Sequence, residues 1–126
     1  MTSQGITVLG STGSIGESTL NVLARHPDRF HVIALSAHSN VERLAEQCSQ
    51  HRARYAVISN ADKAIALQSA LNRLQCKAEV LAGPDALSDV VRMDETEVVM
   101  AAIVGAAGLK PTLHSVQAAK RLLLAN

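Results

Sequence analysis

A glycine-rich segment near the amino terminus carries the residues best suited to binding a phosphate. Gly10, Gly13 and Gly16 are spaced three residues apart in the segment GSTGSIG. The segment follows the apolar run ITVL and precedes a stretch with helical spacing. Glycines in a turn between a strand and a helix let the backbone approach a pyrophosphate, and the free amides at the start of the helix then point at the anion. The segment therefore predicts a phosphate-binding turn.

Each glycine of this turn has an expected part. Gly10 would allow the tight turn, Gly13 the close approach of a pyrophosphate, and Gly16 the close packing of helix on strand. The predicted donors are the amides of Gly13, Ser14 and Ile15 and the hydroxyls of Thr12 and Ser14. A glycine-rich turn that binds nothing is the alternative, because the spacing G-x-x-G-x-x-G differs from the G-x-G-x-x-G fingerprint.

The segment after the second predicted strand indicates which dinucleotide would bind. A site that prefers NAD usually has Asp or Glu there, bonded to the ribose 2′-hydroxyl. Here the strand is followed by SAHSN, and the first acid is Glu42. A carboxylate would repel a 2′-phosphate, so its absence favours NADP over NAD. The predicted donors to that phosphate are His38, Ser39 and Asn40, with Arg43 within reach. Alternatively, Ser39 or Asn40 only caps the next helix.

Small, uncharged residues follow the fifth predicted strand, in the segment AAIVGAAG. At the carboxyl end of a strand they leave room for a dinucleotide to cross the sheet, so Ala102, Ile103 and Val104 are predicted to contact it. Tight packing of strand against helix would demand the same small residues.

The elements that must position these segments alternate along the chain. Strands are predicted at 6–9, 30–35, 55–58, 78–81, 98–104 and 122–125. Helices are predicted between them from apolar positions at helical spacing: Ile15, Thr19, Val22 and Leu23; Val41, Leu44, Ala45 and Cys48; Ala64, Leu67, Leu71 and Leu74; Leu87, Val90 and Val91, with Pro84 in the first turn; and Leu109, Thr112, Leu113 and Val116, with Pro111 in the first turn. This alternation predicts an α/β fold: a Rossmann-like, doubly wound parallel sheet of about six strands with helices on both faces.

Composition narrows the function further. The 126 residues suit one domain spanning 1–126, and an aromatic content of 2% argues against an aromatic platform for nucleic acid. The net charge of +1, without a run of Lys or Arg, makes nucleic acid and anionic membranes poor partners.

No apolar stretch is long enough for a membrane span, and the first residues lack the basic start of a signal peptide. Cys48 and Cys76 form no CxxC pair, which favours reduced thiols in the cytoplasm, and the five His show no metal-ligand spacing.

The segments ITVLGSTGSIGESTLNVL, VMAAIVGAAGLKPTL and LLLAN resemble the N-terminal domain of the 1-deoxy-D-xylulose 5-phosphate reductoisomerases, and the resemblance spans nearly the whole chain. Members of that family make 2-C-methyl-D-erythritol 4-phosphate for isoprenoid synthesis in the MEP pathway. They rearrange the sugar phosphate and reduce the resulting aldehyde with NADPH, using Mn²⁺, Mg²⁺ or Co²⁺. The resemblance also implies a cytoplasmic oxidoreductase that is a homodimer at full length.

The resemblance implies specific contacts as well. Thr12, Gly13, Ser14 and Ile15 would bind the pyrophosphate, His38, Ser39 and Asn40 the adenosine-ribose end, and Asn126 would match a cofactor-contacting Asn. Many members have Gly-Lys-Asn where this chain has His38-Ser39-Asn40. Full-length members continue with Lys-Glu and, later, an acidic metal site, so the sugar-phosphate substrate would be held by domains that this chain lacks.

Two other readings stay open on the residues alone. One is the cofactor domain of another NADPH-dependent enzyme with a GxxGxxG loop, such as a semialdehyde dehydrogenase. The other is a dinucleotide-sensing module without catalysis. Neither a catalytic pair nor a metal cluster can be assembled from the sequence, and seven acids are interpreted as solvated surface charge: Glu42, Glu46, Asp62, Asp85, Asp89, Asp94 and Glu95. We therefore expect the chain by itself to bind dinucleotide and to catalyse nothing.

Overall fold

The computed structural model describes residues 3–103, 111, 117–118 and 120–124. They contain a sheet whose strands all pair in parallel, in the order β4-β3-β2-β1-β5-β6. The strands are β1 (Gln4–Leu9), β2 (Phe30–Ala37), β3 (Tyr55–Ile58), β4 (Glu79–Ala82), β5 (Val98–Ala101) and β6 (Arg121–Leu124). The prediction of a doubly wound parallel α/β sheet is confirmed.

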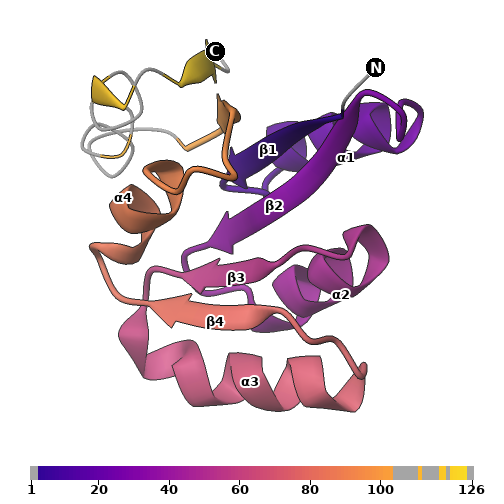
Figure 1. Cartoon of the computed structure of the whole chain (residues 1–126). Coiled ribbons are helices and arrows are strands. Elements are labelled where there is room, and N and C mark those ends of the chain that lie inside the picture. Colours follow the sequence, from indigo (N-terminus) through magenta and orange to yellow (C-terminus); the bar gives the residue numbers. More distant parts are fainter. Residues whose placement is uncertain (1–2, 104–110, 112–116, 119, 125–126) are drawn as a thin grey trace.

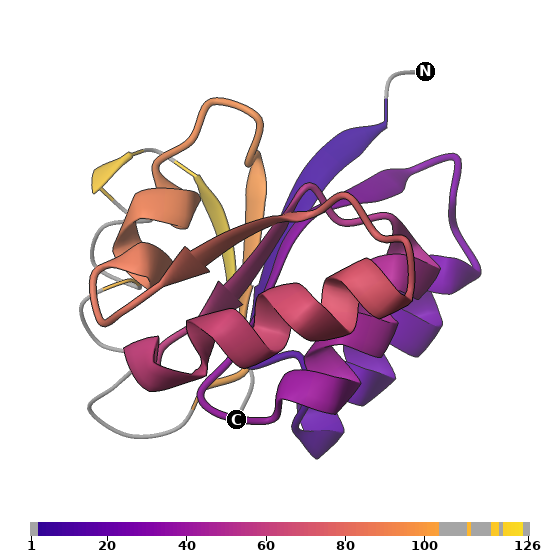
Figure 2. The same cartoon turned by 90° about the horizontal axis from the view of Figure 1, so that it is seen from below.

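Helices cover both faces of this sheet. They are α1 (Ser14–Ala24), α2 (Val41–His51), the 3₁₀ turn η1 (Ala61–Lys63), α3 (Ala64–Arg73) and α4 (Ala86–Val91). Figure 2 shows α1, α2 and α3 together on one face and α4 on the other. Because successive side chains of a strand point to opposite faces, Val8 of β1 packs in the core layer under α1–α3, whereas the next residue, Leu9, packs in the layer under α4.

The order of the strands creates a crevice beside β1. The chain moves outward from β1 to β4 through α1, α2 and α3, and then returns through α4 to place β5 on the other side of β1. The connections on the two sides of β1 therefore lie on opposite faces of the sheet. In open α/β sheets, ligands bind at such a switch point, outside the carboxyl ends of the strands. The arrows of β1 to β4 in Figure 1 all point toward this edge.

The buried face of α1 differs from the predicted one. Gly16, Leu20 and Leu23 are buried, whereas Val22 is 52% exposed and Ile15 only half-buried. The reason is steric: a Cβ at Gly16 would overlap the Gly10 carbonyl and the Ser11 backbone, so the helix can approach the strand only with Gly16 inward. The apolar residues at helical spacing had predicted an inward face of α1 that does not include this glycine.

Several predicted boundaries also move. Strands β1 and β2 are longer than predicted, β4 and β6 are shifted by one residue, and Pro84 precedes Asp85, the N-cap of α4, instead of lying in its first turn. Helix α3 ends at Arg73, so Leu74 is 44% exposed and Ala70 takes the buried place. The helix predicted from Leu109, Thr112, Leu113 and Val116 lies outside the described residues.

Strand β5 ends at Ala101, before the predicted limit at Val104. The Ala102 amide still donates to the Leu9 carbonyl at 2.9 Å, but β1 turns away at Gly10, whose φ is +79°. Strand β5 therefore pairs with β1 only as far as Ala101, which lies opposite Leu9. Val104 itself lies outside the described residues.

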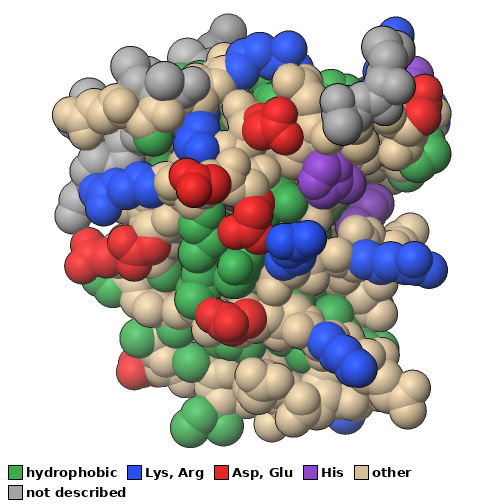
Figure 3. Space-filling view, viewed as in Figure 1, with side chains coloured by type: hydrophobic (Ala, Val, Ile, Leu, Met, Phe, Trp, Pro, Cys, Tyr) green, Lys and Arg blue, Asp and Glu red, His purple; other side chains and the backbone are tan. Residues whose placement is uncertain are grey.

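The surface carries both signs of charge. On the face seen in Figure 3, acidic and basic side chains lie next to each other, and hydrophobic side chains gather in the middle, where Figure 1 has β3 and β4 beside α4. Within the described part of the chain, no helix has the length and apolar character that crossing a membrane would require.

Candidate dinucleotide-binding site

Gly10 is required by the fold. Its φ of +79° lies in the left-handed region, where residues with a Cβ are strained. An added Cβ would also stand 3.0 Å from the Ala102 carbonyl oxygen and 3.2 Å from Cγ1 of Ile103. Gly10 thus turns the chain out of the sheet while keeping the β1 and β5 ends close together.

Gly13 is not required by the protein's own packing. Its φ of −78° and ψ of 172° are extended backbone that any residue adopts, and an added Cβ would meet only the Gly10 carbonyl oxygen, at 3.8 Å. None of the described residues therefore fills the space beside Gly13. A glycine that neither conformation nor packing demands fits a position where a ligand approaches the backbone.

The start of α1 is available to an anion. Gly13 is its N-cap and provides no side-chain cap, whereas Oδ1 of Asn40 accepts the Arg43 amide at the start of α2. The first amides of a helix lack intrahelical acceptors and carry the positive end of the helix dipole. Ser14, exposed, and Ile15, half-buried, lie in this first turn, and Thr12 is half-buried just before it.

A cavity of about 540 Å³ joins these features at the carboxyl edge of the sheet. It is lined by residues at the carboxyl ends of β1, β2, β3 and β5 and around the start of α4: Gly10, Gly13, Ser36, Ala37, His38, Ser59, Pro84, Leu87, Ala102 and Ile103. The structure therefore brings together the glycine turn, the segment after β2 and the segment after β5, which the sequence had predicted separately. Its size and position suit an extended ligand.

The segment after β2 is exposed at the carboxyl edge of the sheet, and its own sequence contains no acid before Glu42. His38, Ser39 and Asn40 are all exposed, and His38 lines the cavity. Asn40 also caps α2, through the 3.3 Å bond from the Arg43 amide. The two readings of Asn40 are compatible, because capping uses its oxygen and leaves its NH₂ group to donate.

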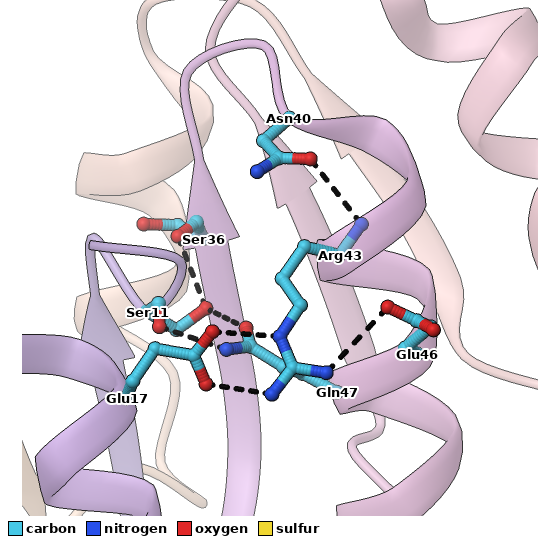
Figure 4. A network of polar contacts seen from close by, with 7 residues as sticks. All are labelled: Ser11, Glu17, Ser36, Asn40, Arg43, Glu46 and Gln47. Carbon is cyan, nitrogen blue, oxygen red and sulfur yellow. Dashed lines mark hydrogen bonds and ion pairs between the residues drawn. The ribbon is translucent and has the colours of Figure 1, made fainter. Parts of the chain in front are cut away.

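Arg43, which was predicted to lie within reach of the phosphate, is bound to Glu17 in the structure. Its Nε and Nη2 donate to the two carboxylate oxygens of Glu17 at 2.6 and 2.7 Å, and Nη1 lies 3.5 Å from Glu46 (Figure 4). This pair raises the pKa of Arg43 further and lowers the pKa of Glu17. The guanidinium thus ties α2 to α1, and its charge is already balanced by a carboxylate. Sequence spacing had not revealed Glu17 as its partner.

A buried polar network under the glycine turn was not predicted either. Gln47 of α2 is completely buried, and its side chain makes two hydrogen bonds to Ser11. Ser36, at the end of β2, accepts from the Gly10 amide through Oγ and from the Ser11 amide through its carbonyl. Figure 4 shows these side chains converging from the turn, β2 and α2. A glutamine on the core side of a helix, beside Leu44 and Cys48, is the signal that could have found the network.

The acidic side chains are dispersed over the described part of the chain. No group of three His, Cys, Asp or Glu could hold a metal ion among these residues. Six of the seven acids are exposed: Glu42, Glu46, Asp62, Asp85, Asp89 and Asp94. Glu95 is half-buried and pairs with Arg54 at 2.8 Å. The predicted contacts Val104 and Asn126 lie outside the described residues.

The fold, with its crevice at the switch point beside β1, defines a doubly wound, Rossmann-like domain of the class that binds dinucleotides. The family model of 1-deoxy-D-xylulose 5-phosphate reductoisomerase matches residues 6–126. The chain belongs to this family.

Relatives and solved structures agree with this assignment. A 1-deoxy-D-xylulose 5-phosphate reductoisomerase from Methylococcus capsulatus is 57% identical over 98% of the chain, and one from Cellvibrio japonicus is 55% identical over 98%. The enzyme from Zymomonas mobilis, solved with NADPH, superposes with a TM-score of 0.91 at 43% identity over 98% of the chain. A reductoisomerase in complex with NADPH, fosmidomycin and magnesium gives 0.92 at 36% identity, also over 98%.

The match covers only part of each relative. The chain spans 32% and 31% of the two curated relatives, and 32% and 30% of the two solved chains.

Proposed function

We propose that this chain is an NADPH-binding domain and that the dinucleotide lies along the carboxyl edge of the sheet. The observation that carries the proposal is the start of α1 at Gly13, which has no side-chain cap, has no described residue filling the space beside it, and borders the 540 Å³ cavity. The pyrophosphate would accept from the amides of Gly13, Ser14 and Ile15 and from the Thr12 and Ser14 hydroxyls. Gly10 and Gly16 shape the turn, and the family relatives solved with NADPH support the choice of ligand.

The adenosine end would lie at the carboxyl end of β2. His38, Ser39 and Asn40 are exposed there without a neighbouring acid in the segment, so they could donate to a 2′-phosphate. The dinucleotide would then cross the sheet over Ala102 and Ile103, and the proposal extends to Val104 and Asn126. When bound, NADPH would supply a hydride to an electrophilic carbon, and the residues named here would bind and orient it.

A titration with both nicotinamide cofactors tests this proposal. We expect NADPH to bind the chain more tightly than NADH in calorimetry, because no carboxylate opposes the 2′-phosphate. Equal affinities, or tighter binding of NADH, would contradict the assignment of the segment after β2. If neither cofactor binds, the proposal that this chain binds NADPH is wrong.

We further propose that the chain acts within a 1-deoxy-D-xylulose 5-phosphate reductoisomerase, which rearranges and reduces that sugar phosphate to 2-C-methyl-D-erythritol 4-phosphate. Family membership and the share of the relatives that is matched support this, with 1–126 as the cofactor domain and the catalytic domains elsewhere. The described residues do not fit a divalent metal, so Mn²⁺, Mg²⁺ or Co²⁺ would be held outside them. Activity of the full-length protein with this substrate, NADPH and Mn²⁺ is the test.

The assembly and location are proposed on the same basis. The full-length protein would be a cytoplasmic homodimer, and light scattering of that protein would measure its mass. The free thiols of Cys48 and Cys76 are compatible with a reducing compartment. Fractionation of the cells that produce the protein would test the location.

A further inference from the structure

We propose that Gln47 is a positioning residue, which holds the glycine turn in the conformation that receives the pyrophosphate. The inference rests on the proposed function. Gln47 does not line the cavity, so it would act through the residues that it contacts, chiefly Ser11. Nothing in the G-x-x-G-x-x-G pattern assigns a part to this side chain, which lies 36 residues further along the chain.

The contacts of Gln47 are complementary to Ser11. Its Oε1 accepts from the Ser11 hydroxyl at 2.7 Å, and its Nε2 donates to the Ser11 carbonyl at 2.9 Å. One amide group therefore bonds both the side chain and the main chain of the same residue. Gln47 and Ser11 each have no exposed surface, so water does not compete for these bonds. Two bonds to one residue fix its orientation as well as its place.

The other polar atoms of the turn are held by β2. The Ser11 amide donates to the Ser36 carbonyl at 2.8 Å, and the Gly10 amide donates to Oγ of Ser36 at 2.9 Å. Ser11 is thus bonded through its amide, carbonyl and hydroxyl to two different elements. The uncapped start of α1 follows two residues later at Gly13, so the direction of its first amides depends on where Ser11 lies.

This arrangement predicts that loss of Gln47 affects ligand contacts at the glycine turn and not ligand contacts at the carboxyl end of β2. Removing the Gln47 amide leaves the buried Ser11 carbonyl without its donor, and leaves the Ser11 hydroxyl only its 3.3 Å bond to the Ser36 carbonyl. The turn must then shift to give the carbonyl a new partner. Such a shift misaligns amides that contact a pyrophosphate. A ligand that binds only at the carboxyl end of β2 does not use those amides. Removing the Gln47 amide should therefore weaken the binding of ligands that contain the pyrophosphate and leave the binding of other ligands unchanged.

The experiment compares Gln47→Met with Gln50→Met in the same 126-residue chain. Both replace a glutamine of α2, but Gln50 is exposed. Each variant is titrated with NADPH and with adenosine 2′-monophosphate, which carries the 2′-phosphate but no pyrophosphate. We expect Gln47→Met to weaken NADPH binding by about tenfold or more and to change adenosine 2′-monophosphate binding by less than about twofold. Gln50→Met should change neither affinity.

If circular dichroism shows that Gln47→Met does not fold, the variant Ser11→Ala provides a second test. Ser11→Ala removes the hydroxyl while leaving the carbonyl bonded to Gln47, and we expect a smaller but equally selective loss of NADPH binding. Equal losses for both ligands, or a folded Gln47→Met that binds NADPH like the unaltered chain, would overturn the inference and leave the proposed function intact. If the unaltered chain does not bind NADPH, the proposed function itself fails.

Discussion

At the scale of single residues, the three glycines of the turn satisfy different demands. Gly10 is required by its positive φ and by its contact with the end of β5, and Gly16 by the approach of α1 to the backbone of Gly10 and Ser11. Gly13 satisfies neither demand. This difference separates glycines that build the fold from one whose absent side chain leaves space for a ligand.

Replacing Gly13 should therefore affect binding more than stability. We expect Gly13→Val to fold, at a cost of about 1 kcal/mol or less for a poorer N-cap residue, and to lose NADPH binding because the side chain occupies the pyrophosphate position. Gly16→Ala is the contrasting variant: its Cβ overlaps the backbone, so it should lower the free energy of unfolding by about 1–3 kcal/mol. Urea unfolding and calorimetry measure the two effects. Normal NADPH binding by folded Gly13→Val would show that the turn does not hold the cofactor.

His51 should make stability depend on pH. Burial, and then the charge of Arg43, lower its pKa below the ordinary value of 6.5. Between that value and the lower pKa in the folded state, the unfolded chain binds the proton more readily, so stability falls as the pH falls below about 6.5. We expect His51→Gln to lose this component when thermal midpoints are compared between about pH 5 and 8. If the thermal midpoints of the two proteins change with pH in parallel, this prediction is wrong.

At the scale of elements, one ion pair and one buried network link α2 to the start of α1. The Glu17–Arg43 pair bridges the helices at the surface, while Gln47 reaches Ser11 below it (Figure 4). The two predicted phosphate-binding segments, which precede α1 and α2, are thereby held at a set separation. This arrangement suits a ligand that spans both.

The surface pair should contribute modestly to stability. Its side chains are 39% and 33% exposed, so a double-mutant cycle of Glu17→Gln and Arg43→Met should give a coupling energy of about 1 kcal/mol or less. Glu46→Gln, which removes the longer 3.5 Å contact, is the control and should couple less strongly to Arg43→Met. Because Arg43 lowers the pKa of Glu17 from 4.5, the coupling is present above pH 4.5 and is lost as the pH falls through the lower folded-state value. A coupling unchanged under strong acid would contradict this assignment.

At the scale of the whole molecule, the strand order determines where a ligand can lie. The reversal from β4 back to β5 opens the crevice beside β1, and the ends of β1, β2, β3 and β5 line it. The acids of the described residues lie elsewhere, mostly exposed. The described residues thus form a crevice at the switch point of the sheet, and they contain no group of side chains that could hold a metal ion.

We therefore expect the 126-residue chain to catalyse no reaction alone. Hydride transfer requires the aldehyde carbon to be held roughly 3–3.5 Å from the nicotinamide, and the rearrangement requires a cation bound by several converging oxygens. The assay follows NADPH oxidation with 1-deoxy-D-xylulose 5-phosphate and Mn²⁺. Turnover above the control without protein would show that the catalytic groups lie within this chain.

The sequence by itself determined the class of fold and the location of the turn, because alternating apolar runs and helical spacing, like the glycines, are local signals. The glycine spacing predicted close packing at Gly16, but hydrophobic spacing did not determine the rest of the inward face of α1. Local signals also did not determine the end of β5 or the partner of Arg43. Each of these depends on which segments meet in space: Gly16 against Gly10 and Ser11, β5 against the end of β1, and Arg43 against Glu17. Gln47 and Ser11 are 36 positions apart, and their bonds exist only because parallel pairing of β1 with β2 brings α2 beneath the turn. Tertiary structure decides such contacts because buried polar groups must find partners wherever the packed chain places them.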